Sequence, residues 1–203
     1  MTTNNIVKKI TNLYEERIAL IRGVSLGDNV GGKIRSLSGS LGEDISALAW
    51  GEVGRHYSKL HNFEFETLKG DSRKVLCING NKNSIEMQVD RHQYIDDELF
   101  HIEECKSYLD RCYMIRASDD FRMIKKHTNN NITSSIMAIE NSVKKESYDF
   151  IMDEGYIDDV FFLADGKRSS TKPIWKEGHY KPLNKTKVAG YIKTIVSIFE
   201  KRA

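Results

Sequence analysis

The chain has 203 residues, of which 39% are hydrophobic and 30% are charged, so it carries enough apolar side chains to build the core of one folded domain. Its 31 lysine and arginine residues nearly balance 29 aspartate and glutamate residues, and the net charge of +2 points to no class of partner. The sequence has no apolar run that could span a membrane and no apolar centre of a signal peptide, which argues against a membrane protein and predicts a cytoplasmic one. Its three cysteines have no paired spacing, which argues against a zinc site and predicts reduced thiols.

The N-terminal part of the chain predicts two helices joined by a loop. Apolar residues recur at helical spacing over residues 5–22. Residues 23–40 are rich in glycine and serine, which predicts a loop and not the interior of a helix. Helical spacing returns from Leu41, where Ser40 is a candidate N-cap and Glu43 follows three residues later, as in a capping box.

The spacing of apolar residues then changes to the alternation typical of strands. We expect strands within residues 62–70, 73–80, 83–90 and 98–106, with residues 91–97 forming the turn before the last of them. Connections of this length predict hairpins between neighbouring strands.

The C-terminal half returns mainly to helical spacing. Residues 107–126 and 132–152 predict helices, the second of them in one or two pieces, and residues 156–166 predict an apolar strand followed by a turn. A basic loop with a short strand at Pro173–Trp175 leads to a last amphipathic helix over residues 185–202. This order of elements predicts an α/β or α+β sheet with helices on both faces.

The strand predicted at 98–106 begins with apolar residues and ends in a cluster of charges. Side chains two residues apart on a strand share a face. We therefore expect Glu104 and Lys106 to project together, with Phe100 and Ile102 beneath them on the same face. Glu103 is expected on the opposite face.

Asp90 ends the preceding predicted strand and is the candidate partner of Glu104 and Lys106. Two carboxylates bind a hard divalent cation, and a metal with a nearby lysine suits the hydrolysis of a phosphodiester bond. Asp96 and Asp97 are nearer in sequence but fall in the predicted turn. The register that would bring Asp90 beside Glu104 is not fixed by the sequence, and an ordinary surface ion pair between Glu104 and Lys106 remains the alternative.

Asp90 followed by Glu104-Cys105-Lys106 resembles the D…(D/E)xK signature of restriction-endonuclease-like nucleases, and Gly42-Glu43 resembles the start of the acidic helix that precedes the catalytic hairpin in that family. The resemblance covers about residues 36–166. It implies an α/β fold with a restriction-endonuclease-like mixed central sheet flanked by helices. It also implies Mg²⁺ as the cofactor, held by Asp90 and Glu104, with Lys106 assisting the attacking water and Glu43 as a peripheral acidic residue of the catalytic set.

The same resemblance implies a sequence-specific deoxyribonuclease of the type II restriction class, acting as a homodimer on double-stranded DNA. We expect one nuclease domain over residues 1–203, with its catalytic core at about 36–166 and a C-terminal basic loop and helix at 167–203. A capping role for Glu43, which needs no metal, stays open beside its role in the resemblance.

Basic and amide side chains that could contact DNA occur in several clusters. Lysine and arginine neutralise phosphates, while arginine and asparagine read the edges of guanine and adenine. The candidates are Lys33, Arg35, Arg116, Arg122, Asn130, Lys167 and Arg168.

Two other functions fit the same residues. One is a repair, resolvase or nicking nuclease with the same active site, and the other is a non-enzymatic DNA-binding or assembly protein. The sequence contains no P-loop, no dinucleotide-binding glycine motif after a strand and no G-x-S-x-G elbow, which argues against kinases, nucleotide-dependent oxidoreductases and serine hydrolases.

Overall fold

The structure is a computed structural model that describes residues 2–25, 31–69, 76–79, 84–128, 131–169, 173–176 and 178–202. Within these ranges the side chains of residues 25, 31, 35, 76–79, 84 and 85 are not described. In chain order the elements are α1 (Thr3–Ser25), α2 (Gly31–His61), β1 (Phe65–Lys69), β2 (Leu76–Asn79), β3 (Ser84–Met87), β4 (Arg91–Ile95), β5 (Glu98–Leu109), α3 (Arg111–His127), β6 (Thr133–Asn141), α4 (Lys145–Asp153), β7 (Asp159–Phe162) and α5 (Lys185–Glu200). None of the described helices is both long and apolar enough to cross a bilayer.

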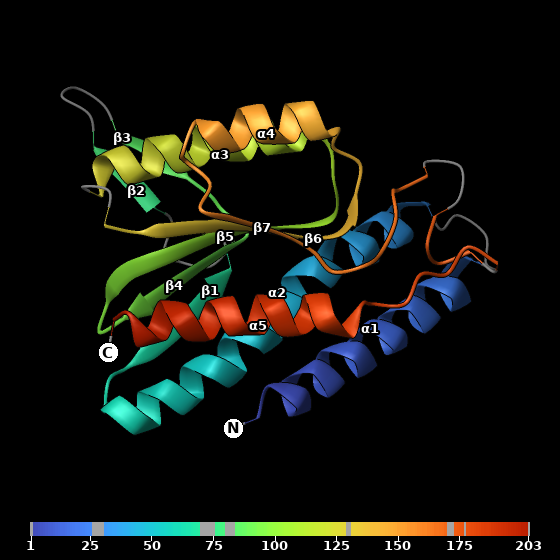
Figure 1. Cartoon of the computed structure of the whole chain (residues 1–203), viewed down its shortest axis with the longest axis horizontal. Helices are drawn as coiled ribbons and strands as arrows, with labels where there is room; N and C mark the ends of the chain where they lie inside the picture. Colours follow the sequence, from blue (N-terminus) through green and yellow to red (C-terminus); the bar gives the residue numbers. More distant parts are fainter. Residues whose placement is uncertain are drawn as a thin grey trace.

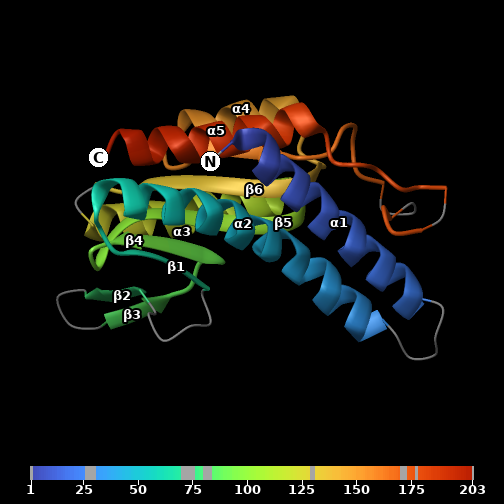
Figure 2. The same ribbon diagram turned by 90° about the horizontal axis from the view of Figure 1, so that it is seen from below.

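A mixed five-stranded sheet forms the centre of the protein, in the order β1-β4-β5-β6-β7, and β2 pairs with β3 in a separate hairpin. The strands β1, β4 and β5 are antiparallel neighbours, while β5, β6 and β7 run parallel. Helices α1, α2 and α5 cover one face of the sheet, and α3 and α4 cover the other (Figures 1 and 2). The predicted mixed α/β architecture with helices on both faces is confirmed.

Each face of the sheet has its own hydrophobic core. The core beneath α1, α2 and α5 contains Trp50, Phe100 and Phe199, and the core beneath α3 and α4 contains Ile102 and Phe121. Strand β5 contributes to both cores, so its two faces are fixed by packing on opposite sides.

Most of the glycine- and serine-rich segment is helical, and the prediction of a loop there is wrong for residues 23–25, which end α1, and for residues 31–40, which begin α2. Helix α2 begins at Gly31. The Ser38 hydroxyl donates to the Ile34 carbonyl at 2.7 Å, so a residue that usually disfavours helices is satisfied inside this one. Ser40 therefore lies inside the helix and is not its N-cap. Residues 26–30 of the predicted loop lie outside the described residues.

The segment predicted as a turn at residues 91–97 is mostly strand β4, and that prediction is wrong. Arg91, His92 and Gln93 are buried, so polar residues occupy a strand that pairs on both sides. The turn itself is confined to Asp96 and Asp97, whose φ values of 48° and 67° match the two positive values that a tight hairpin turn requires.

A β-bulge in β5 alters the predicted alternation. The register between β4 and β5 shifts between Gln93 and Tyr94 and leaves Phe100 as the extra residue. Phe100 therefore turns toward α2 and packs against Trp50, with ring centroids 6.1 Å apart. The prediction that Phe100 lies beneath Glu104 is wrong, whereas Ile102 does lie on the face covered by α3.

Three further predictions change in the C-terminal half. The predicted helix at 132–152 is wrong in its first part, which forms β6, and correct in its second part, which forms α4. Strand β6 lies between two parallel neighbours and is buried on both faces, so its sequence lacks strand alternation. The helix predicted from residue 107 begins at Arg111, because β5 continues to Leu109. Pro173–Trp175 is part of a turn closed by the Lys176 amide donating to the Pro173 carbonyl at 3.0 Å.

Candidate functional site

The hairpin of β4 and β5 brings Asp90 beside Glu104, near the middle of β5. The prediction that Asp90 ends a strand is wrong, because β3 ends at Met87 and Asp90 immediately precedes β4. Arg91, the first residue of β4, pairs with Glu103 in the antiparallel register. The Cys105 amide donates to Asp90 Oδ2 at 2.8 Å, which fixes the Asp90 side chain against the edge of β5. The expected partnership of Asp90 and Glu104 is therefore present in the fold.

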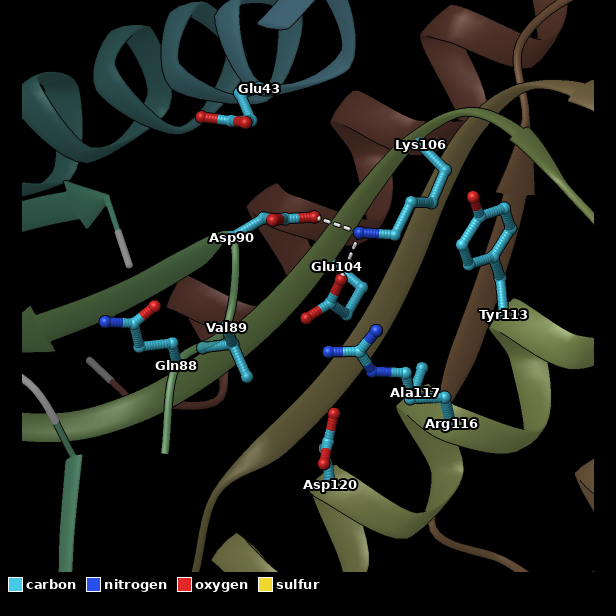
Figure 3. A pocket seen from close by; sticks show the side chains of 10 residues that line it. All are labelled: Glu43, Gln88, Val89, Asp90, Glu104, Lys106, Tyr113, Arg116, Ala117 and Asp120. Atoms are coloured by element: carbon cyan, nitrogen blue, oxygen red, sulfur yellow. Dashed lines mark hydrogen bonds and ion pairs between the residues drawn. The ribbon is translucent and has the colours of Figure 1, made fainter. Parts of the chain in front are cut away.

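Lys106 connects the two carboxylates. Its Nζ lies 2.6 Å from Asp90 Oδ2 and 2.5 Å from Glu104 Oε2, and all three side chains point into one cavity (Figure 3). The Glu104 side chain is only 11% exposed. A half-buried ammonium between two carboxylates holds them close together, and the two carboxyl groups are hydrogen-bonded to one another.

The electrostatics of these groups are strongly perturbed. Burial raises the pKa of Glu104 to about 8, with a further upward contribution from the charge of Asp90. Burial also acts to raise the pKa of Asp90, but the charge of Lys106 and hydrogen bonds from Glu104, Lys106 and the Cys105 amide outweigh it and leave that pKa below its usual value. Burial acts to lower the pKa of Lys106, and the two carboxylates reverse this and raise it. The lysine is therefore an ammonium at neutral pH.

Glu43 faces the same cavity from α2. Its Oε2 lies 3.6 Å from Lys69 Nζ, and the Arg91 guanidinium donates to the Glu43 carbonyl oxygen at 3.0 Å. Burial raises the pKa of Glu43, with the charge of Asp90 contributing in the same direction. Because α2 begins at Gly31, Glu43 is not a residue of the first helical turn, and the capping role is excluded.

The opposite face of β5 carries Glu103, as the alternation predicts. Glu103 is fully buried and accepts hydrogen bonds from Trp50 Nε1 at 3.2 Å, Ser135 Oγ at 2.7 Å, Tyr191 Oη at 2.9 Å and the Ser46 hydroxyl. These donors come from α2, β6 and α5. The carboxylate therefore connects β5 to three elements behind it.

The cavity that contains Asp90, Glu104 and Lys106 has a volume of about 340 Å³. Its other lining residues are Glu43, Gln88, Val89, Tyr113, Arg116, Ala117 and Asp120. Tyr113, Arg116 and Asp120 project from α3 toward the carboxylates (Figure 3). Sequence reasoning missed Tyr113 and Asp120, although their spacing of seven residues is a helical signal that places them on one face.

The candidate DNA contacts fall into three groups. Arg116 lines the cavity that contains Asp90, Glu104 and Lys106, and Arg168 lines a second cavity that adjoins it. Arg122 pairs with Asp119 at 3.2 Å outside both cavities. Lys33 and Lys167 are exposed but line neither cavity, whereas Asn130 and the side chain of Arg35 lie outside the described part of the chain.

The donor chemistry of the Asp90–Glu104 pair fits a hard divalent cation. Mg²⁺ is usually bound through one or two carboxylates and completes its coordination with water and phosphate oxygens. The raised pKa of Glu104 reflects repulsion by Asp90 as well as burial, and a cation would relieve that repulsion. Across the described residues, no group of three or more histidine, cysteine, aspartate or glutamate side chains is arranged to hold a metal, so such a site would rest on two carboxylates.

No protein-family model matches the chain, and no curated protein is similar enough to count as a relative.

Proposed function

We propose that the protein is a Mg²⁺-dependent endodeoxyribonuclease that hydrolyses phosphodiester bonds. The observation that carries this proposal is the convergence of Asp90, Glu104 and Lys106 in one cavity, through a hairpin register that the motif alone could not specify. The same convergence supports the proposal that the mixed sheet and its helices form a restriction-endonuclease-like fold.

In this proposal some residues of the cavity bind the cation, and others stabilise negative charge on the phosphate. Asp90 and Glu104 would hold the cation, which when bound supplies the Lewis acidity that activates water and stabilises the leaving oxygen. Lys106, as an ammonium, can donate hydrogen bonds to negatively charged oxygens. Arg116 enters the cavity from α3 and can donate to an oxygen of the same phosphate.

Within this class we propose a type II restriction endonuclease that acts as a homodimer on a short palindrome in double-stranded DNA. A twofold-symmetric dimer presents two equal sites to the two strands. A repair, resolvase or nicking nuclease uses the same cavity on another DNA substrate, and a non-enzymatic DNA-binding protein would use the surface without the chemistry.

Two substitutions test the nuclease proposal. We expect Glu104→Gln and Lys106→Ala to reduce Mg²⁺-dependent cleavage at least about a hundredfold, since each removes charge that the reaction uses, while DNA binding stays within a few fold. Glu98→Gln on the exposed end of β5 and Lys59→Ala on the exposed end of α2 are matched controls that should cleave normally. Full cleavage by both site variants would overturn the assignment of these residues.

The narrower proposal is tested with Mg²⁺ and a fully sequenced phage DNA. Discrete bands support site-specific restriction, whereas a smear supports a non-specific nuclease. Intact DNA across a broad panel of substrates, with binding retained, would favour the non-enzymatic alternative.

A further inference from the structure

The catalytic cavity continues past Lys106 into a second cavity of about 510 Å³. The two cavities share Glu43, Asp90, Lys106 and Tyr113. They differ in their outer walls, because Arg116 lines only the first and Arg168 lines only the second. The two cavities therefore adjoin at the candidate catalytic residues, and each has one arginine in its lining that the other lacks.

The Arg168 guanidinium is held in place by an aromatic side chain of the catalytic strand. Its central carbon lies 3.3 Å from the centroid of the Tyr108 ring. The Tyr108 ring packs edge-on against Tyr113, with centroids 5.6 Å apart and an interplanar angle of 68°. Stacking of this kind combines cation–π attraction with planar contact, so it restricts the orientation of the guanidinium.

The backbone around Arg168 is fixed as well. Its amide donates to the Asn141 carbonyl at 2.8 Å, and Lys167 forms an isolated bridge with Asn141 at the end of β6. The Lys181 ammonium donates to the Lys167 carbonyl at 2.6 Å and pairs with the buried Glu140 at the same distance. The backbone of Arg168 is therefore fixed to the end of β6 by these hydrogen bonds.

The guanidinium keeps its donors available. Within the described part of the chain, no carboxylate or carbonyl accepts a hydrogen bond from the Arg168 side chain, whereas Arg17, Arg55, Arg91 and Arg122 each have an oxygen partner. A planar fork of N–H groups, pre-oriented by stacking and without an acidic partner, matches a phosphate group.

We propose that Arg168, stacked on Tyr108, is a pre-organised clamp for a backbone phosphate that flanks the scissile phosphate. The proposal rests on the nuclease function and extends it: the cleaved strand passes from Arg116, over Asp90 and Lys106, to Arg168. Tyr108 is a positioning residue that acts through Arg168. Its aromatic ring is the part that matters, because the ring orients the guanidinium.

The first experiment measures binding of a DNA duplex in the absence of divalent cations, as a function of salt concentration. We expect Arg168→Ala to weaken binding about tenfold at low salt and to reduce the magnitude of the slope of log affinity against log salt by about 1, the value for one lost phosphate contact. Arg168→Lys should keep the slope but lose part of the affinity, since an ammonium has no planar fork. Arg55→Ala, at an exposed arginine paired with Glu52, is the matched control and should bind like the wild type.

The coupling of the two residues gives a sharper criterion. Tyr108→Leu should weaken binding as Arg168→Ala does, and the double variant should be no weaker than Arg168→Ala alone, because Tyr108 acts only through Arg168. Tyr108→Phe keeps the ring and should bind like the wild type. Additive losses in the double variant, or an unchanged salt slope in Arg168→Ala, would overturn the clamp.

A second experiment locates the phosphate. Single phosphates along a duplex that the protein binds are replaced one at a time by uncharged methylphosphonates. We expect one flanking position on the cleaved strand to weaken binding by the wild type but not by Arg168→Ala. If no position behaves so while the DNA is cut normally, the clamp fails and the nuclease proposal stands. If one position does and no DNA is ever cut, the phosphate site stands as a binding feature and the nuclease proposal fails.

Discussion

Gly42 of α2 lies directly on the backbone of Lys106. A Cβ atom added at position 42 would stand 3.2 Å from the Lys106 amide nitrogen and 3.4 Å from its carbonyl oxygen. The missing side chain lets the helix approach the end of β5 closely, and the next residue, Glu43, then faces Asp90 across the cavity. Gly42 therefore sets the distance between α2 and β5, and this distance places Glu43 in the candidate site.

The close approach at Gly42 predicts a graded loss of activity. Gly42→Ala must shift α2 by a few tenths of an ångström, and Gly42→Val must shift it further. Such overpacking lowers the free energy of unfolding by roughly 1–3 kcal/mol. For alanine, its higher helix propensity offsets about 1 kcal/mol of this loss. We expect cleavage to fall several fold in the first variant and further in the second, measured as initial rates. Gly51→Ala is the control, since its new Cβ would contact only the end of Arg55, at 3.6 Å. Equal rates in all three variants would show that this spacing does not matter.

Replacing Glu43 separates a role in the cavity from a role in the helix. The loss of a capping side chain typically destabilises a protein by about 1 kcal/mol. Because Glu43 lies well inside α2, we expect Glu43→Gln to change the free energy of unfolding by less than about 0.5 kcal/mol, measured by urea denaturation. Cleavage should fall about tenfold, because a carboxylate near Asp90 is lost. A stable variant with full activity would remove Glu43 from the catalytic set.

Local sequence signals predicted α1, α5, the part of α2 from Leu41 onward and most of β5. The apolar spacing of α1 and α5 and the buried face of α2 follow from one packed side per helix, whereas β5 is packed on both faces. Glu104 and Lys106 could be paired by alternation, because the bulge at Phe100 lies before them and leaves their relative orientation unchanged.

The predictions that failed did so where tertiary structure overrides local pattern. The polar residues of β4 look like a turn, and they form a strand because both of their neighbours are strands. Strand β6 is buried on both faces, so periodicity cannot distinguish it from a helix. The contribution of Tyr113 and Asp120 depends on where α3 crosses the sheet, which no local pattern encodes.

Glu103 is expected to stabilise the fold from behind the site. Removing its carboxylate would leave several buried donors without an acceptor, including Tyr191 Oη and Ser135 Oγ. Each unsatisfied buried donor lowers the free energy of unfolding by about 1–3 kcal/mol. We expect Glu103→Ala to lower the free energy of unfolding by at least about 3 kcal/mol in urea denaturation. Tyr191→Phe removes one donor and leaves the carboxylate with its other partners, so its loss should be about 1 kcal/mol. Equal losses in the two variants would contradict a shared network.

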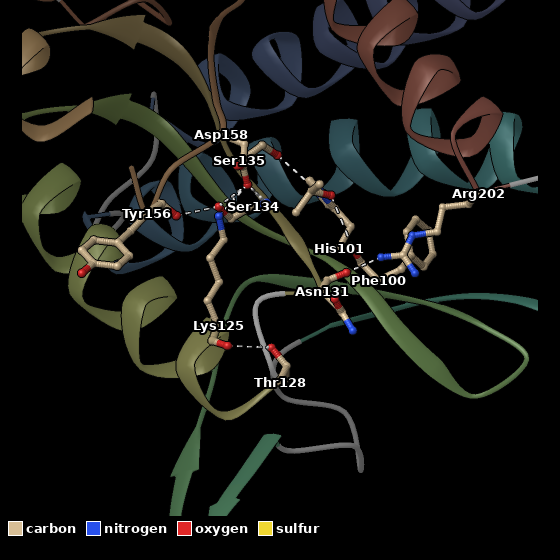
Figure 4. Close-up of polar contacts among 11 residues, drawn as sticks. Phe100, His101, Lys125, Thr128, Asn131, Ser134, Ser135, Tyr156, Asp158 and Arg202 are labelled. Atoms are coloured by element: carbon tan, nitrogen blue, oxygen red, sulfur yellow. Dashed lines mark hydrogen bonds and ion pairs between the residues drawn. The ribbon is translucent and has the colours of Figure 1, made fainter. Parts of the chain in front are cut away.

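His101 predicts how stability depends on pH. Its ring is fully buried, lies 2.8 Å from Thr133 Oγ1 and 2.9 Å from Ser135 Oγ, and packs against Trp50 with centroids 4.5 Å apart (Figure 4 shows its surroundings). Burial lowers the pKa of His101 to about 3, and the positive charge of Lys125, which pairs with Asp158, contributes in the same direction.

The sign of the effect follows from which state binds the proton. In the unfolded chain a histidine has a pKa of about 6.5, so below that pH the unfolded state gains a proton that the folded state does not. The contribution of His101 to stability is therefore complete above about pH 6.5 and is lost as the pH falls toward 3. The slope is at most about 1.4 kcal/mol per pH unit within this window.

We expect His101→Gln to flatten the dependence of the free energy of unfolding on pH between about 6 and 4, measured by urea denaturation at several pH values. Glutamine can still form hydrogen bonds with both hydroxyl groups, but it does not titrate. Its smaller contact with Trp50 lowers the free energy of unfolding by the same amount at every pH. Only the loss of the titrating group changes the slope of stability against pH. The exposed His56, replaced by glutamine, is the control and should keep the wild-type slope. If wild type and His101→Gln lose stability in parallel as the pH falls, the acid sensitivity arises from other groups.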